Sequence, residues 1–342
     1  MTIIYTPLAT PLKKYVASSK LSYDATSASL NSDPILGADY YGFTPAIISA
    51  NYGFEGYMGV PNVNGTDTAS QQAAYAGNAS WEAIDPALGA GLRAYTSALG
   101  ANAFFNIYGT TALQADTIPV VFNMPVQGST VNATDFQVKL NTGELVTPLS
   151  ASFLPNLEFN EMQTVVLSGY WGNRILPGQP GAQYPVSVTI VQDDTPLTAV
   201  TPRGLSSLVG LTIESKNPYV AGNGPILVGA KLNQMSDLGE GGPLWSTASN
   251  NNSGTDLFGS DAQYRLRLST SAGFSPDGIA SLAPDEFSQY FVLTALDDLH
   301  RSINITESGV QYKVGGFGTV EVLGIADTGP SQASLISFME TF

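Results

Sequence analysis

Histidine-dependent catalysis in this chain would have to centre on one residue, because His300 is its only histidine. It lies in Asp297-Asp298-Leu299-His300-Arg301, and any Ser-His-Asp set would need it as the base. The nearest approach to a nucleophile elbow, residues 204–208 (Gly-Leu-Ser-Ser-Leu), lacks the second glycine of Gly-x-Ser-x-Gly. A single histidine beside two aspartates is more often part of a solvated turn, so we predict an exposed turn at 297–301.

Carboxylates are the other groups that could do chemistry, since glycoside cleavage needs two of them at a suitable separation. The available acids are Glu158, Glu161, Glu240, Asp285 and Glu286. No spacing selects a pair from this set. Enzymes that depend on His-x-x-x-His, Gly-x-Gly-x-x-Gly or Gly-x-x-x-x-Gly-Lys are disfavoured, because the chain carries none of these motifs in the required context.

Two pairs of adjacent acids, Asp193-Asp194 and Asp297-Asp298, follow predicted strands and could hold Ca²⁺ through oxygen ligands. Neither continues into an EF-hand loop or a glycine-rich calcium repeat, so we expect solvated turns at both. The sequence therefore nominates no catalytic, cofactor-binding or metal-binding residue, and we expect no cofactor.

The composition favours a loop-rich β protein. Only 12% of the residues are charged, about half the usual share, while 43% are apolar, which argues against a disordered chain. A net charge of −15 repels nucleic acid and anionic membranes, so we expect neither as a partner. We also expect no membrane insertion, since no apolar run reaches the ~18–20 residues that cross a bilayer.

The absence of cysteine excludes disulfides, thiolate metal sites and thiol nucleophiles. With the low isoelectric point and the Thr, Asn and Gly content, it fits exported bacterial β proteins or virion proteins best, which predicts an extracellular, cell-surface or virion location. The first residues, Met1 to Pro7, lack the basic head and apolar core of a signal peptide. We therefore expect either a leader that has been removed or release by lysis or another route.

The elements that would position these groups are mainly strands. Residues 118–122 and 163–167 are rich in β-branched residues, and residues 136–140 and 184–191 alternate apolar with polar side chains. Four strands separated by turn residues need a second layer to cover their apolar faces. A β-sandwich over residues 117–205 is the simplest prediction.

Residues 117–194 also carry a pattern that resembles the Ig-like domains of bacterial surface-layer and adhesion proteins. The matching pieces are Val121-Phe122-x-x-Pro125-Val126, Ser129-Thr130-Val131 leading into Phe136-x-Val138, Leu176-Pro177-Gly178, and Tyr184-x-Val186-x-Val188. The chain departs from the pattern in a longer turn at 178–183 and in Pro185, which can only lie at an edge or a bulge. The resemblance implies a stalk, spacer or assembly unit without a catalytic set.

Residues 1–116 form the first predicted region. Residues 1–22 contain Lys13, Lys14 and Lys20 and no acid, which describes either a solvated tail or an extended arm that packs on its own acidic body or on a neighbouring subunit. Aromatic residues crowd among glycines at 35–57; they form either an irregular core, which we favour, or a sugar-stacking platform. An amphipathic helix is predicted near 86–99, with Asp85 as N-cap and Gly100 as the stop.

Residues 206–342 form a second predicted β-rich region. Strands are expected at 208–213, 226–232, 264–268, 290–296, 310–314 and 319–325, with a long loop at 233–260. The tail, residues 335–342, is too apolar to remain in water. An apolar extended tail gains by covering a sheet edge of its own or of a neighbouring copy, so we expect self-association.

These patterns lead to a functional hypothesis. The chain is expected to be a mainly β, cysteine-free, acidic structural, adhesion or assembly protein without enzymatic activity, built on an Ig-like sandwich with a possible glycan or cell-surface partner. The alternative, from a different class, is a carbohydrate-active enzyme or carbohydrate-binding protein that uses carboxylates and the Tyr/Phe cluster at 40–57.

Overall fold

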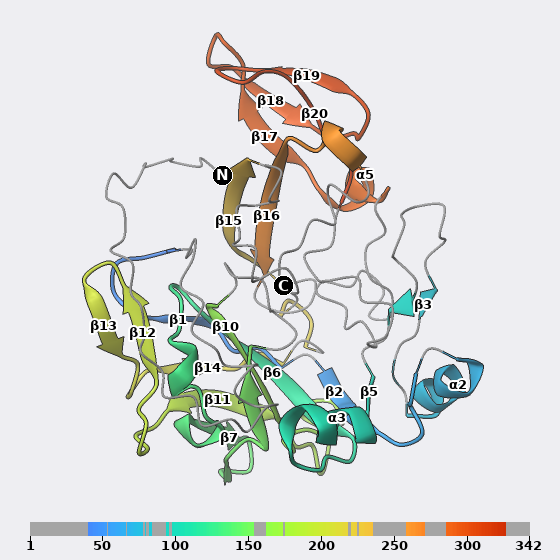
Figure 1. Cartoon of the computed structure of the whole chain (residues 1–342), viewed down its shortest axis with the longest axis vertical. Helices are drawn as coiled ribbons and strands as arrows, with labels where there is room; N and C mark the ends of the chain where they lie inside the picture. The colour runs from blue at the N-terminus through green and yellow to red at the C-terminus, as the bar shows by residue number, and fades with distance from the viewer. Residues whose placement is uncertain are drawn as a thin grey trace.

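A computed structural model gives the architecture of most of the chain (Figure 1). It describes residues 40–52, 54–65, 67–77, 79, 82–83, 94–95, 98–153, 162–173, 175–217, 220–223, 226–234, 258–270 and 285–325. These residues form several β-sheets and few helices, so the predicted mainly β class is confirmed.

The central strand is β6 (Ala115–Phe122), in which every residue is buried. It pairs antiparallel with β10 (Thr164–Gly169) on one side and with β1 (Ile47–Ser49) and β2 (Phe54–Val60) on the other. The outer strands are β9 (Ser150–Ser152) beside β10 and β5 (Leu99–Gly100), which runs parallel to β2. The sheet therefore has the order β5-β2-β6-β10-β9, with β1 also on β6.

Pro119 explains why two short strands, and not one long strand, lie along this side of β6. The N–H of Phe122 donates to Gln163 O (2.8 Å) on the β10 side, so by alternation residues 117, 119 and 121 face β1 and β2. Residues 117 and 121 pair with Phe54 and Ser49, and Pro119, which has no N–H, falls at the break between them. A proline can thus occupy an interior strand without removing a ladder hydrogen bond.

The second sheet has the order β14-β11-β7-β8, and all its pairs are antiparallel. Its strands are β7 (Phe136–Leu140), β8 (Leu145–Val146), β11 (Pro185–Ile190) and β14 (Thr212–Glu214). Pro185 is the first residue of β11, and the pairing register shifts directly after it. This is the edge-or-bulge position that the sequence requires of a strand proline.

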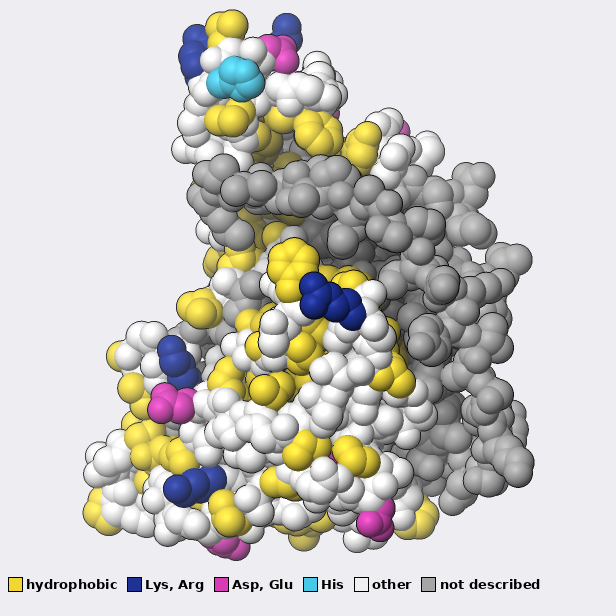
Figure 2. Space-filling model, turned by 90° about the vertical axis from the view of Figure 1, so that its left-hand side faces the viewer, with side chains coloured by type: hydrophobic (Ala, Val, Ile, Leu, Met, Phe, Trp, Pro, Cys, Tyr) yellow, Lys and Arg dark blue, Asp and Glu magenta, His cyan; other side chains and the backbone are white. Residues whose placement is uncertain are grey.

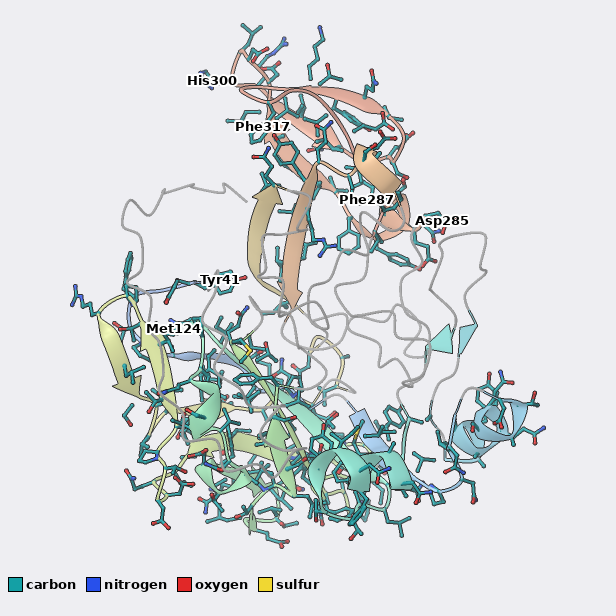
Figure 3. The ribbon with its side chains drawn as sticks, viewed as in Figure 1. Tyr41, Met124, Asp285, Phe287, His300 and Phe317 are labelled. Carbon is teal, nitrogen blue, oxygen red and sulfur yellow. The ribbon has the colours of Figure 1, made fainter. Side chains whose placement is uncertain are left out.

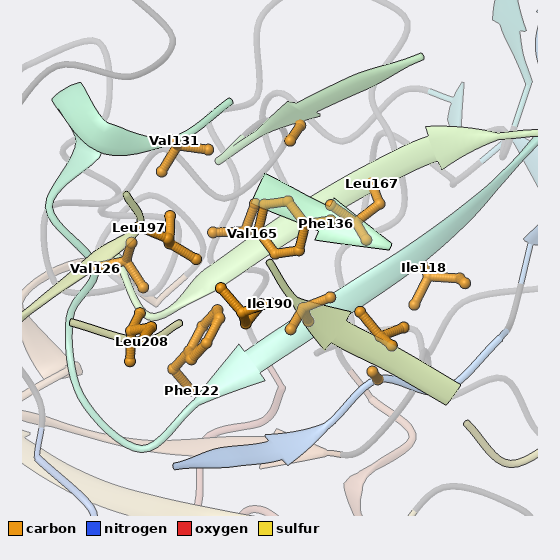
Figure 4. Close-up of a cluster of buried hydrophobic side chains, with 14 of the residues drawn as sticks. Ile118, Phe122, Val126, Val131, Phe136, Val165, Leu167, Ile190, Leu197 and Leu208 are labelled. Atoms are coloured by element: carbon orange, nitrogen blue, oxygen red, sulfur yellow. The ribbon is translucent and has the colours of Figure 1, made fainter. Parts of the chain in front are cut away.

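One hydrophobic core joins the two sheets (Figure 4). From the first sheet, every second side chain of β6 and β10 points into it, including Ile118, Phe122 and Leu167. From the second sheet, Phe136 of β7 and Ile190 of β11 meet them. Residues from the connections close the ends of the core: Val126, Val131, Leu197 and Leu208. Two sheets that share one hydrophobic core form a sandwich.

The sheets extend beyond the predicted limits of the sandwich. Strands β1 and β2 come from the region that we assigned to a separate N-terminal part, and β14 comes from the predicted second β-rich region. β1 also contacts β14, and the N–H of Lys216 donates to Asn51 Oδ1 (3.2 Å). These pairings join residues far apart in the sequence, which local patterns at 117–205 do not reveal.

The helices differ from the prediction. Of the predicted helix near 86–99, the described residues Ala94–Tyr95 are strand β4 and Leu99 begins β5; most of the others lie outside the described residues. On either side of this stretch, helices form at α2 (Thr68–Ala76), capped by Asp67, and at α3 (Ala101–Tyr108). Gly100, expected as a helix stop, is instead the N-cap of α3.

Short elements complete the sandwich and its surroundings. They are hairpin β12 (Thr198–Thr201)–β13 (Gly204–Ser207), the pair β3 (Glu82–Ala83)–β4, and the 3₁₀ turns η2 (Gly128–Thr130), η3 (Ala133–Asp135) and η5 (Gly259–Asp261). An isolated bridge between Val126 and Ala199 connects β12 to the loop after β6.

A buried carboxylate anchors the start of β6. Asp116, 4% exposed, accepts hydrogen bonds from the N–H groups of Gly56 (2.7 Å), Trp171 (3.0 Å) and Gly172 (2.8 Å). Gly56 lies in β2, whereas the other two donors follow β10. The side chain of Asp116 therefore holds both neighbours of β6 in place.

Asn123, directly after β6, has a matching role at the other end. Its side chain accepts from Ala46 N–H (2.9 Å) and donates to Thr44 O (2.8 Å). Its backbone accepts from Tyr41 N–H (2.7 Å) and donates to Ala46 O (3.1 Å). These bonds fix the segment that leads into β1.

A two-stranded ribbon leads from the sandwich to a C-terminal module of residues 285–325 (Figure 1). The ribbon pairs β15 (Leu227–Gln234) with β16 (Tyr264–Thr270). The module contains α5 (Phe287–Tyr290) and the hairpins β17 (Leu293–Leu296)–β18 (Ser302–Ile305) and β19 (Gln311–Val314)–β20 (Gly318–Glu321). The ring of Tyr264 meets Phe317 edge-on, with centroids 6.3 Å apart, and so connects ribbon and module.

The sandwich core gives a first test of this architecture. Phe136→Ala or Phe122→Ala should lower the free energy of unfolding by about 3–5 kcal/mol, because each ring is buried between the sheets. Phe105→Ala is the matched control, since the Phe105 ring is 51% exposed on α3. Urea denaturation in which Phe136→Ala is as stable as the parent would show that β7 does not contribute to this core.

The anchor at the start of β6 gives a second test. Asp116→Asn places an amide NH₂ where a carboxylate oxygen accepts, so at least one buried N–H loses its acceptor. The expected loss of stability is about 1–3 kcal/mol. Asp298→Asn, at an exposed turn position, serves as the control and should leave the denaturation midpoint unchanged. Equal midpoints for the two variants would contradict the anchoring role.

Candidate functional site

The only histidine lies in the exposed turn between β17 and β18 (Figure 2). Asp297 organises this turn by accepting from the N–H groups of Leu299 and Arg301 (both 2.9 Å) and from Arg301 Nε (2.7 Å). The Arg301 hydrogen bonds, from its backbone and then its side chain, lower the pKa of the Asp297 carboxyl. His300 itself adopts a left-handed φ of 57° in the turn. The residues around His300 therefore form a turn, and the carboxylate of Asp297 is occupied by hydrogen bonds from Leu299 and Arg301.

The two candidate carboxylates that the structure describes, Asp285 and Glu286, do not lie beside His300. Asp285 is exposed and Glu286 half-buried at the start of α5, and Figure 3 places Asp285 well away from His300 within the C-terminal module. Glu158, Glu161 and Glu240 lie outside the described residues. Among the described residues, therefore, none of these candidate acids forms a catalytic arrangement with His300.

The aromatic segment at 40–57 contributes mainly to packing. Tyr52 is fully buried in the sandwich core, and Tyr40 packs against that core. Tyr41 lies over Gly229 of β15, where an added Cβ would be 2.7 Å from the ring (Figure 3). Tyr57 packs against the small clusters near α2 and α3, while Phe43 is 91% exposed. These rings are distributed over several contacts and do not form one exposed stacking surface.

The most unusual polar group of the described residues is Asp135, which the sequence did not single out. It is the last residue of η3, is fully buried, and directly precedes β7. Its Oδ2 accepts from Asn132 N–H (2.7 Å) in a capping box. Its Oδ1 is buried without a hydrogen-bond partner. Ionising a carboxyl group that has a buried oxygen without a hydrogen-bond donor is energetically unfavourable.

The neighbour of Asp135 is Asp193, one of the acids that the sequence placed in a solvated turn. Asp193 is half-buried, and its carboxylate accepts from Thr134 Oγ1 (2.6 Å) and from Thr195 N–H (2.8 Å). Asp194, next in the chain, is exposed. The segment between β6 and β7 and the segment after β11 are also joined by a backbone hydrogen bond, from Val191 N–H to Asp135 O (2.7 Å). They therefore bring two carboxyl groups together at one end of the sandwich.

This environment changes the acidity of Asp135. Burial raises its pKa from 3.8 to about 7; the Asn132 N–H opposes the shift, and the negative charge of Asp193 adds to it. A carboxyl group with such a pKa exchanges its proton near neutral pH.

The pair is suited to holding a proton and poorly suited to holding a metal. Within the described ranges, no group of three or more His, Cys, Asp or Glu side chains could hold a metal ion. Ca²⁺ takes six to eight oxygen ligands, and both oxygens of Asp193 already accept protein hydrogen bonds. Sequence spacing could have revealed the capping box Asn132-x-x-Asp135, but not the burial, because the covering segment lies nearly 60 residues later in the chain.

Comparisons with known proteins found no match. No family model matches the chain, and neither the curated proteins nor the solved structures contain a match. Among the described helices, none is long and apolar enough to cross a membrane.

Calcium should be dispensable for stability. In the described part of the chain, no group of three or more acidic or histidine side chains is arranged to hold a metal ion, at Asp193-Asp194 or at Asp297-Asp298, so chelation with EGTA should leave the melting temperature within experimental error. Scanning calorimetry with EGTA, and again after Ca²⁺ is restored, measures this. A fall of many degrees that Ca²⁺ reverses would contradict the expectation and would direct attention to these two acid pairs.

Proposed function

We propose that this chain is a non-enzymatic structural, adhesion or assembly protein that acts outside the cell, at a cell surface or in a virion, and that its sandwich is Ig-like. The observation that carries the proposal is the order of strands in the two sheets. In an Ig-like sandwich, strands A, B, E and D form one sheet and strands C, F and G the other, with C′ added beside C in some members.

The order of the strands along the chain supports this assignment. Taken in sequence, β1 with β2, β6, β7, β8, β9, β10, β11 and β14 correspond to A, B, C, C′, D, E, F and G. Apart from β5, which adds a further strand at the outer edge of β2, the sheets β2-β6-β10-β9 and β8-β7-β11-β14 then have the orders A-B-E-D and C′-C-F-G. The pairs within these orders are antiparallel, as the assignment requires. The insertions, α2 to α3 and hairpin β12–β13, fall between strands and leave the order unchanged.

The C-terminal module supports a role in assembly. Its two hairpins turn Leu293, Ile303 and Ile305 inward, but of the module's apolar residues only Phe287 and Ile305 are buried. Several large apolar side chains remain exposed there: Val292, Leu296, Leu299, Val310 and Phe317. Two-stranded hairpins are marginally stable alone, so contact with a second copy of the chain would stabilise this module. The carbohydrate-binding alternative needs an exposed aromatic surface, and the rings at 40–57 are largely used in packing.

Self-association provides the test. The purified full-length chain should form an oligomer whose molar mass, measured by light scattering after size exclusion, rises with concentration. The double variant Val292→Asp/Leu296→Asp should reduce the association constant at least tenfold, since it places charge on the exposed apolar positions. Leu145→Asp is the matched control, because Leu145 is 55% exposed on β8 of the sandwich and lies outside the module.

Negative-stain microscopy of the same samples should show regular assemblies for the parent and for Leu145→Asp. A parent that is strictly monomeric at high concentration would contradict the assembly role. Specific binding on a glycan array, or turnover of a polysaccharide panel, would favour the carbohydrate alternative instead.

A further inference from the structure

The Asp135–Asp193 pair lies where two connecting segments of the chain are joined. The first runs from β6 to β7 and contains η2 and η3; the second runs from β11 to β12. Besides the contacts of the two acids, Asn132 Nδ2 donates to Thr195 Oγ1 (2.7 Å), and Thr198 N–H donates to Thr130 Oγ1 (3.1 Å). The polar contacts at this end of the sandwich therefore surround the acid pair.

The charges around Asp135 are of one sign. Burial is the largest influence on its pKa, Asp193 is the one charged group that acts on it, through its charge and a side-chain hydrogen bond, and the backbone N–H groups of Asn132 and Leu197 oppose the shift. The neighbouring elements bring hydroxyl groups, from Thr134 and Thr195, and the exposed Asp194. Among the described residues, no lysine, arginine or histidine acts on Asp135 to offset the negative charge that it would carry beside Asp193. Two adjacent ionised carboxylates, one of them fully buried, would repel each other strongly.

We propose that Asp135 and Asp193 share one proton, and that this proton locks the β6–β7 connection to the β11–β12 connection. The proton resides on Asp135 Oδ1, which has no other hydrogen-bond partner, and this hydroxyl donates to the carboxylate of Asp193. Oδ2 continues to accept from Asn132 N–H. Loss of the proton leaves two carboxylates in contact, which drives the β11–β12 connection away from η3. The pair is thus an acid-stabilised latch at one end of the sandwich.

The direction of the pH effect follows from proton binding. The folded chain holds this proton up to a pH of about 7, whereas an unfolded aspartate releases it near 3.8. Because the native state binds more protons than the unfolded state in this interval, the stability that the latch contributes is complete below about pH 4 and is lost as the pH rises toward 7.

Asp135→Asn separates the latch from general effects of pH. The asparagine is similar in size; its amide can donate permanently to Asp193 while its carbonyl accepts from Asn132 N–H, so it mimics the protonated acid. The parent should lose several degrees of melting temperature between pH 5 and pH 8, and this loss should be absent in Asp135→Asn. Asp194→Asn removes an equal charge from the adjacent exposed residue and should melt with the parent's pH dependence.

A second variant and a spectroscopic measurement keep the proposal testable if Asp135→Asn does not fold. Asp193→Asn removes the repelling charge, so the midpoint of the pH-dependent loss should move to lower pH, and a carboxyl ¹³C NMR titration should show Asp135 releasing its proton at correspondingly lower pH than in the parent. The protection of the Thr195 and Leu197 amides against hydrogen exchange, measured relative to the intrinsic exchange rate at each pH, should fall between pH 5 and pH 8 in the parent but not in Asp135→Asn.

Three results would overturn the latch. The first is an identical pH dependence of melting in the parent and Asp135→Asn. The second is an Asp135 carboxyl that titrates near pH 4 in the folded parent. The third is full restoration of the parent's stability at pH 8 by millimolar Ca²⁺ without effect on Asp135→Asn, which would identify the pair as a cation site and not a proton site.

Discussion

Three backbone N–H groups converge on the buried carboxylate of Asp116, and the sandwich depends on this contact because of what the donors belong to. One donor lies in β2 and two follow β10, so a single side chain on β6 fixes the strands on both of its sides. Asn123 repeats the arrangement at the far end of β6 with the segment before β1. Between the two, the strand contributes only apolar side chains and Pro119 to its neighbours, apart from Thr117. Register is therefore set by polar contacts at the ends of β6 and stabilised by apolar packing between them.

The sequence predicts individual strands well where the local pattern is decided by one buried face. β7 coincides with the predicted 136–140, and β10, β11, β16 and β19 agree with their predicted positions to within a few residues, because alternation and β-branching act locally. Prediction from the sequence fails where pairing with a distant strand decides the local structure. The stretch at 94–100 has helical spacing of Leu and Tyr, yet Leu99 lies in a strand parallel to β2, a partner some 40 residues earlier. The sequence does not predict the Asp135–Asp193 pair for the same reason. The turn at Asn132-x-x-Asp135 is a local signal, whereas the burial of Asp135 depends on residues 191–197.

Stability is unevenly distributed over the described chain. The sandwich holds a continuous core with fully buried Trp171, Phe122, Phe136 and Phe153, while the C-terminal module has two buried apolar residues and a stacked pair, Phe287 and Phe291, whose centroids are 6.1 Å apart. Regions with few buried contacts open locally at lower free-energy cost than a dense core. The C-terminal module should therefore open locally at a lower free-energy cost than the sandwich does.

The pairing of β1 with the end of β6 also has a kinetic consequence. Ile47 pairs with Phe122, so the first strand of the sandwich cannot be incorporated until a long stretch of later chain has been synthesised. The last strand, β14, pairs with β11 and contacts β1, which closes the structure only after residue 214 has emerged. Closing such long loops before their contacts form slows folding, and unpaired strand edges are exposed meanwhile to other nascent chains. The break at Pro119 shortens the continuous edge that such a chain could join, since β6 lacks a donor at its midpoint on that side.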